Sequence, residues 1–226
     1  MNSLYRKSTI NRINKKFKLL NSDKFTATTF MNLRLTTSLL LFIILLLFNN
    51  KGYIYGPVLA IVCYLSFEYV LDLKIKKRRD KLNYEAIFFF QVLVLTLESG
   101  KNLQGGIELT CKSINNEISN EFKKSLEEVK LGRSLIEALN NMKDRIPSEE
   151  INTVILNITQ STIFGNNVIE SLNNQIDYLK DKKLLDIKAN INKMPLKISV
   201  ISVIFIVPII MLLILGPVLI NYLINS

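Results

Sequence analysis

The chain has 226 residues, of which 49% are hydrophobic, and a formal net charge of +10. It has no histidine and no tryptophan, and its two cysteines, Cys63 and Cys111, lie in different segments without the spacing of metal ligands. This composition excludes a histidine-based catalytic triad and argues against a zinc site or a disulfide framework. The sequence also has no phosphate-binding loop, no dinucleotide-binding glycine motif and no evident strands. We therefore predict an all-α protein that is not an enzyme, with no catalytic residues, no cofactor and no metal.

The first predicted element is a basic arm, residues 1–32. Its apolar residues Ile10, Ile13, Phe17 and Leu20 fall at helical spacing, with basic residues between them. Such a segment forms either a short amphipathic helix on the anionic inner leaflet of a membrane or a flexible arm whose charges only set the topology. The sequence alone leaves both interpretations open.

Residues 33–73 are predicted to form a transmembrane hairpin. Residues 33–48 are strongly apolar, although at ~1.5 Å per residue a helix of this length is slightly short for a hydrocarbon core of ~30 Å. Arg34 would reach the headgroups by extending its side chain. A tight turn at 49–52 then leads to a second span, 53–73. A secretory signal peptide is the competing interpretation, and it is disfavoured because the preceding basic region is long and no small-residue cleavage site follows.

Lysine and arginine mark the two outer flanks of this hairpin, whereas its turn holds only Lys51. The positive-inside rule therefore places residues 1–32 and everything after the hairpin in the cytoplasm. Glu68 and Asp72 lie near the inner end of the second span. We interpret them as interfacial anchors, with Asp72 paired to Lys76 one turn further on, and we give a proton relay less weight.

Residues 74–83 are predicted to be a basic juxtamembrane linker. Its cations form a predicted membrane-surface basic cluster: Lys74, Lys76, Lys77, Arg78, Arg79 and Lys81. The basic residues lie beside the apolar segments, which favours lipid headgroups over nucleic acid as their partner. Nucleic-acid binding is also disfavoured because aromatic residues are not interleaved with the basic ones, as a base-stacking platform requires.

Residues 84–194 are predicted to form a cytoplasmic bundle of six helices. The segment 84–99 is apolar all round but too short to cross a membrane comfortably, which is typical of a buried central helix. Its three consecutive phenylalanines, 88–90, are interpreted as core rather than as a ligand pocket. Five further helices are predicted at 103–115, 118–131, 134–144, 148–163 and 167–192.

Three similar fragments mark structural turns of this bundle. Their glycines, Gly100, Gly132 and Gly165, lie roughly 33 residues apart, a spacing typical of repeated helical units. Each is predicted to end a helix in the left-handed conformation, which glycine adopts without a Cβ clash. A polar residue then caps the next helix. The predicted caps are Asn102, Ser134, and Asn166 or Asn167.

Residues 195–226 are predicted to hold a third transmembrane helix and a short outer tail. The predicted kinks of this helix are Pro195, Pro208, Gly216 and Pro217. Proline removes a backbone donor and bends a helix, which a membrane bundle tolerates. The predicted fold is thus an all-α integral membrane protein with an N-terminal transmembrane hairpin, a cytoplasmic six-helix bundle and one C-terminal transmembrane helix.

The ordered set of glycine turns, followed by a proline-bearing membrane helix, resembles the type II secretion system F-domain family. Within that family it is most similar to the tight-adherence (Flp) pilus assembly proteins TadB and TadC. The fragments that carry the resemblance are Leu97–Gly100, Leu131–Leu135, Phe164–Gly165 and Leu215–Pro217. The likeness covers residues 84–220, well over half of the chain.

The resemblance implies an inner-membrane platform for assembly of a type IV or Flp-type pilus, or of a related secretion system. Such a platform contacts a cytoplasmic ATPase and pilin subunits in the membrane. The family has no catalytic residues that could be assigned to positions of this chain. Larger members carry two F domains and this chain holds one, which implies a second F-domain membrane protein, or self-association, as a partner. The alternatives are a structural F-domain component of another machine, such as that of sporulation, and, with less support, a small transporter subunit.

Overall fold

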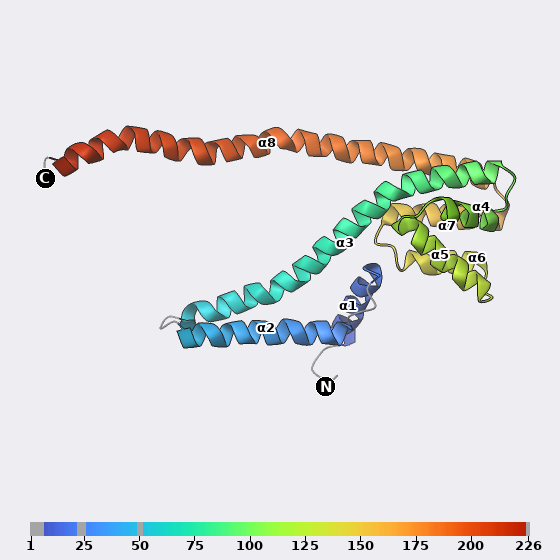
Figure 1. Ribbon diagram of the computed structural model, residues 1–226, viewed down its shortest axis with the longest axis horizontal. Coiled ribbons are helices and arrows are strands. Elements are labelled where there is room, and N and C mark those ends of the chain that lie inside the picture. The colour runs from blue at the N-terminus through green and yellow to red at the C-terminus, as the bar shows by residue number, and fades with distance from the viewer. Residues whose placement is uncertain (1–6, 22–25, 49–51, 225–226) are drawn as a thin grey trace. The chain divides into compact units, whose positions relative to one another are not determined.

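The computed structural model describes residues 7–21, 26–48 and 52–224, and these ranges hold eight helices (Figure 1). The helices are α1 (Lys7–Leu19), α2 (Ala27–Phe48), α3 (Gly52–Glu98), α4 (Leu103–Ser113), α5 (Glu117–Lys130), α6 (Leu135–Lys143), α7 (Glu149–Phe164) and α8 (Val168–Ile224). No strand occurs within the described ranges, and the predicted all-α class is confirmed. Parts of the predicted arm, most of the predicted turn at 49–52 and the end of the predicted tail lie outside them.

The chain divides into two compact units, Met1–Ile176 and Asp177–Ser226. The first unit contains α1 to α7 and the start of α8, and the second contains the rest of α8. Among the described residues, two segments are long and apolar enough to cross a membrane, Ala27–Leu47 and Val168–Pro217. The predicted second span, 53–73, is not one of them, so a three-span topology stays a prediction.

The long helix α3 replaces two predicted helices and the linker between them. It runs without a break from Gly52 to Glu98, so the predicted basic linker 74–83 is part of a helix. The physical reason lies in its composition. No glycine or proline occurs between Pro57 and Gly100, and lysine and arginine are good helix formers.

The first part of α3 runs beside α2 as a helical hairpin (Figure 1). The hydroxyl of Ser38 in α2 donates a hydrogen bond of 3.0 Å to the backbone oxygen of Ala60 in α3. Gly56 lies against the ring of Phe42, where a Cβ would come within 3.1 Å of the ring carbons. The absence of a Cβ at this point leaves room for the Phe42 ring to pack against α3.

The second part of α3 is the central helix of a bundle with α4 to α7. Phe89 and Phe90 are fully buried, and the ring of Phe122 from α5 stacks on Phe89 with centroids 4.5 Å apart. Phe88, in contrast, is 59% exposed. The prediction that all three phenylalanines belong to the core is therefore wrong for Phe88, because each step along an α-helix turns the side chain by ~100°.

Most bundle helices begin at the residues that the sequence predicts. The Asn102, Ser134 and Ser148 side chains each accept a hydrogen bond from a backbone N–H three residues on, which satisfies a free donor of the first turn. Asn167 accepts from the N–H groups of Ile169 and Glu170. The helix predicted at 118–131 begins one residue earlier, because Asn116 caps it through the Ser119 N–H.

The three glycine turns have the backbone conformation that the repeated fragments predict. Gly100, Gly132 and Gly165 have φ angles of +86°, +97° and +70°. A Cβ at any of them would meet no atom within 4 Å, so conformation rather than space selects glycine. Because successive helices are antiparallel, the α3–α4, α5–α6 and α7–α8 turns share one end of the bundle (Figure 1).

In the second unit, α8 stays helical from Asp177 to Ile224 and passes through Pro195, Pro208 and Pro217. Large apolar side chains are exposed along it from Ile198 to Leu215. Such a continuous apolar surface suits a hydrocarbon environment. The predicted kinks at the prolines and at Gly216 stay predictions.

We expect the substitution Gly132→Val to destabilise the bundle by about 1–3 kcal/mol, because a β-branched residue is strained at positive φ. Thermal unfolding of the purified protein in detergent measures this loss. The matched control is Gly132→Asn, which tolerates the left-handed conformation and should cost less. Equal stability of the valine variant and the wild type would contradict the assigned role of the turn.

Candidate functional site

Arg78 of α3 is the centre of a buried ionic network. Its side chain is only 7% exposed, and it forms ion pairs of 2.7 Å with Glu117 and 2.8 Å with Glu121, both from α5. Its Nη1 donates to the backbone oxygen of Arg145 in the α6–α7 connection and to that of Leu19 at the end of α1. One guanidinium thus joins three segments that are far apart in the sequence.

This placement corrects the predicted membrane-surface basic cluster. Arg78 is buried and paired, so it is not part of a surface that meets lipid headgroups. Arg79 pairs with the neighbouring Asp80, and Lys81 lies 3.0 Å from Glu117. The exposed cations that remain of the cluster on this stretch of α3 are Lys74, Lys76, Lys77 and Lys81. Sequence alone misassigned Arg78 because burial depends on which helix packs against α3.

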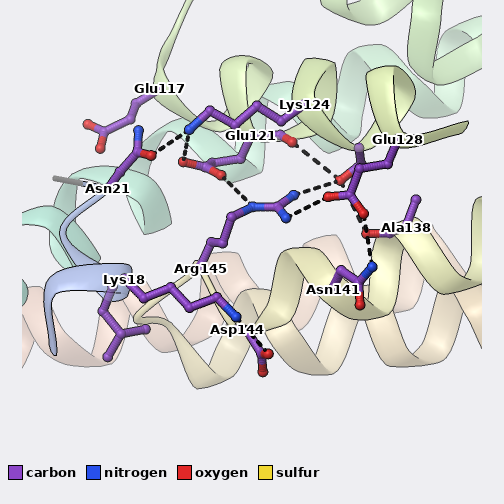
Figure 2. Close-up of polar contacts among 12 residues, drawn as sticks. Lys18, Asn21, Glu117, Glu121, Lys124, Glu128, Ala138, Asn141, Asp144 and Arg145 are labelled. Carbon is purple, nitrogen blue, oxygen red and sulfur yellow. Dashed lines mark hydrogen bonds and ion pairs between the residues drawn. The ribbon is translucent and has the colours of Figure 1, made fainter. Parts of the chain in front are cut away.

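Glu121 is the most deeply buried carboxylate of the network, with a side chain that is 0% exposed. Figure 2 shows Arg145 and Lys124 beside it, with the Arg145 Nε at 3.2 Å and the Lys124 Nζ at 3.5 Å from its oxygens. Together with Arg78, three cations surround one carboxylate. Such pairing is necessary because an isolated buried charge is strongly unfavourable.

A second carboxylate, Glu128, extends the network toward α6. The Arg145 Nη1 lies 2.7 Å from one of its oxygens, while the other accepts from the Asn141 amide (Figure 2). Arg133 donates to that second oxygen as well. The Arg145 Nη2 also donates to the Ser125 hydroxyl. Arg145 therefore ties the α6–α7 connection to two successive turns of α5.

The network favours the ionised forms of Glu117 and Glu128. Burial disfavours the charged form of Glu117, but hydrogen bonds from Arg78 and Lys81 outweigh that penalty and hold the pKa of Glu117 below its usual value. Burial likewise opposes the ionisation of Glu128. Hydrogen bonds from Asn141, Arg145 and Arg133 overcome it, so the pKa of Glu128 is also lowered.

The predicted arm contains a helix, α1, that packs on its own chain. Ile13 and Phe17 are buried in a cluster with Ala27, Met31 and Leu71 of α2 and α3. The sequence offered a membrane-surface helix or a flexible arm for this segment. The structure shows a third arrangement, since the same apolar face is already covered by the helical hairpin.

Ion pairs flank this apolar contact. Lys16 of α1 lies 2.6 Å from Asp72 and 3.2 Å from Glu68, both on α3. Asp72 thus meets Lys16 instead of the predicted Lys76. Arg34 was predicted to extend to the headgroups, but its side chain is 8% exposed. Its guanidinium lies 3.5 Å from the centre of the Tyr64 ring, a cation–π contact, and 3.6 Å from Glu68.

The end of α1 also touches the bundle. The Lys18 ammonium lies 3.0 Å from the carboxylate of Asp144, which follows α6. The Lys124 ammonium donates to the side-chain oxygen of Asn21, just beyond α1 (Figure 2). With the Arg78 contact to Leu19, three polar contacts therefore join the end of α1 to the bundle, two of them through residues of the network.

The chemistry of this site is ion pairing that fixes helices relative to one another. Within the described ranges, no group of three or more His, Cys, Asp or Glu residues could hold a metal ion. Burial raises the pKa of the Cys111 thiol in α4, which makes it a poor nucleophile at neutral pH.

The sequence analysis did not predict that the acidic residues of α5 take part in a partly buried network. The signal is present, however, because Glu117, Glu121, Lys124 and Glu128 follow one another at steps of four, three and four residues. That spacing places them on one face of α5. The face lies next to an apolar one formed by Ile118 and Phe122, an arrangement from which partial burial of charge could have been inferred.

Comparison with known proteins gives one match. The family model for type II secretion system (T2SS), protein F, matches residues 89–216, more than half of the chain. No curated protein and no solved structure matches significantly. The matched part begins within α3, contains α4 to α7 and ends within α8, so α1, α2 and Arg78 lie before it.

Replacing the buried carboxylate by Glu121→Ala should destabilise the protein by about 3–5 kcal/mol, because Arg78 and Arg145 would lose their shared partner. Chemical unfolding in detergent gives the change. Glu127→Ala, an exposed change on the same helix, is the matched control and should be nearly neutral. A loss no larger than that of the control would contradict the role of the network.

Acid should destabilise the bundle through Glu117 and Glu128. Because their folded pKa values are lowered, their contribution is present above the ordinary value of 4.5 and is lost as the pH falls through the lower folded values. Unfolding temperatures recorded from neutral pH downward should fall most steeply below that point. The variant Glu117→Gln, which cannot ionise, should show a shallower dependence; an unchanged slope would count against this source of acid sensitivity.

Proposed function

Because the chain belongs to the type II secretion system protein F family, we propose that it is an inner-membrane platform protein for assembly of a type IV or Flp-type pilus, or of a related secretion system. Its role would be non-catalytic: it would couple a cytoplasmic ATPase to the extraction of pilin subunits from the membrane. The observation that carries the proposal is the family match over 89–216. The finer assignment, to the group of TadB and TadC, is supported by the resemblance of the glycine-turn fragments to those proteins.

The proposed topology is a multi-pass cell-membrane protein with its N-terminus and bundle in the cytoplasm. The segments Ala27–Leu47 of α2 and Val168–Pro217 of α8 support spans at both ends of the chain. The residues 53–73 of α3 form the proposed second span, and large apolar side chains exposed there support it: Val58, Leu59, Ile61, Val62 and Leu65. The basic flanks orient these spans.

Force transmission would use continuous helices. Helix α3 runs from the hairpin into the centre of the bundle, and α8 runs from the bundle into its long apolar part, each without an interruption. Backbone hydrogen bonds along a helix resist its stretching and compression, so a push on one end is passed along the axis, while bending is still allowed. A displacement of the bundle by the ATPase would therefore reach the membrane segments.

The proposed partners follow from this role. They are the cytoplasmic ATPase, a second F-domain protein or a second copy of this chain, pilin subunits and the lipid bilayer, and they do not include nucleic acid. The exposed lysines 74, 76 and 77 of α3 are proposed to meet anionic headgroups. A structural component of another secretion-like machine, such as that of sporulation, is the alternative that shares the same fold.

The test is affinity purification of the tagged full-length protein from crosslinked membranes, with the co-isolated proteins identified by mass spectrometry. We expect a secretion-type ATPase together with a second F-domain protein. The matched control is the same preparation with Gly132→Val, in which the bundle is destabilised while the membrane segments are unchanged, so that recovery of the ATPase should fall.

The outcomes separate the candidates. Recovery of the ATPase and pilin-like subunits supports the platform role. Recovery of the components of a sporulation machine favours the alternative. Recovery of transport subunits, with ion flux through liposomes that contain the purified protein, would overturn both in favour of a transporter.

A further inference from the structure

Helix α1 contacts two parts of the first unit at once. Its apolar face and Lys16 hold it on the hairpin helices α2 and α3, while its last residues contact the bundle network. Within the first unit, α3 is the only stretch of backbone that leads from the hairpin into the bundle. If α3 were the only connection, the hairpin could bend and twist relative to the bundle about this helix. A second attachment restrains both motions.

We propose that α1 and the two residues after it form a brace that fixes the angle between the α2–α3 hairpin and the bundle. The brace has an anchor and a tip. The anchor is the buried contact of Ile13 and Phe17 with Met31 and Leu71, flanked by the Lys16 pairs with Asp72 and Glu68. The tip is the set of polar contacts that Lys18, Leu19 and Asn21 make with the bundle.

One contact of the tip pairs a cation of the bundle with the free carbonyl groups at the end of α1. The last carbonyl groups of an α-helix have no partner in the helix and carry partial negative charge. The Arg78 guanidinium donates to the Leu19 carbonyl while it also pairs with Glu117 and Glu121. The same cation therefore satisfies both the end of α1 and the buried acidic face of α5.

The two remaining tip contacts connect α1 to different parts of the bundle. Lys18 reaches Asp144, beside the α6–α7 connection, and Asn21 accepts from Lys124 in the middle of α5. Contacts to separate elements define an orientation, whereas a single contact would leave α1 free to pivot. Both partners flank Arg145, so the brace ends at the network that holds α5 to α6 (Figure 2).

The brace lies before the family match, which begins at residue 89, so it is a property of the N-terminal part of this chain. Its geometry stands independently of any function. Its consequence rests on the proposed platform role: a braced hairpin would move with the bundle, whereas an unbraced one would absorb part of the displacement by bending of α3.

The experiment uses a zero-length carbodiimide crosslinker on membranes that contain the full-length protein. This reagent joins an amine to a carboxylate only where the two are in contact. The Lys18–Asp144 separation of 3.0 Å and the Lys16–Asp72 separation of 2.6 Å predict two crosslinked peptides. The first reports the tip and the second reports the anchor.

Charge reversal makes the test specific. Lys18→Glu should abolish the 18–144 crosslink and leave the 16–72 crosslink intact. The double variant Lys18→Glu with Asp144→Lys restores an amine opposite a carboxylate and should restore the crosslink. The control is Lys15→Glu, an equal change of charge at an exposed position of α1, which should leave both crosslinks unchanged.

Hydrogen exchange gives a second readout in the same variants. Loss of one exposed ion pair should speed exchange of the last α1 amides by up to about five-fold, and the double variant should reverse this. Exchange in α4 and α7 should stay unchanged, which separates release of the tip from unfolding of the bundle. Equal exchange in the wild type, Lys18→Glu and the double variant would overturn the brace, as would absence of the 18–144 crosslink in the wild type.

Assembly of the pilus or secretion of its substrate, measured in the producing cells, tests the consequence. Reduced assembly in Lys18→Glu with recovery in the double variant supports the brace as part of force transmission. Unchanged assembly in Lys18→Glu despite loss of the crosslink overturns that role. Normal assembly after deletion of the whole gene would instead overturn the proposed function, and the crosslinks would still decide whether the brace exists.

Discussion

The arrangement of the first unit depends on the three cations that compensate the buried charge of Glu121. This carboxylate has no exposed surface, and it is stable there only because Arg78, Arg145 and Lys124 surround it. The three cations come from α3, from the α6–α7 connection and from α5 itself. Since each must reach the same two oxygens, the ionic contact specifies how these segments approach one another more narrowly than apolar packing would.

The bundle combines this ionic constraint with close apolar packing. The rings of Phe89, Phe90 and Phe122 fill the space between α3 and α5, and the glycine turns let successive helices reverse direction within a few residues. The apolar contacts supply most of the stabilisation, whereas the ion pairs select the arrangement. Most of this bundle lies in the segment that matches the family of type II secretion system protein F, whose members work within secretion machinery.

The N-terminal part of the chain adds a feature that the family match does not cover. Arg78 lies eleven residues before the matched segment, yet it completes the charge balance of α5 within that segment. The hairpin side of α3 and the bundle side are therefore linked by side chains as well as by the helix backbone. In the proposed platform, this is the part of the chain at which motion of the cytoplasmic bundle would pass to the membrane segments.

The sequence by itself determined the all-α class, most boundaries of the bundle helices and the positions of the glycine turns, because these follow from local periodicity, capping and the φ angles that glycine allows. It also indicated the family through the ordered turn fragments. Its composition also allows α3 to continue through 74–83, although the prediction divided that helix. Only the tertiary structure decided that Phe88 faces outward and that α1 lies on its own chain. It alone also decided that Asp72 meets Lys16 and that Arg78 is buried. These features depend on which helix faces lie opposite one another, and contacts between residues 39 or 126 positions apart are not specified by the local sequence.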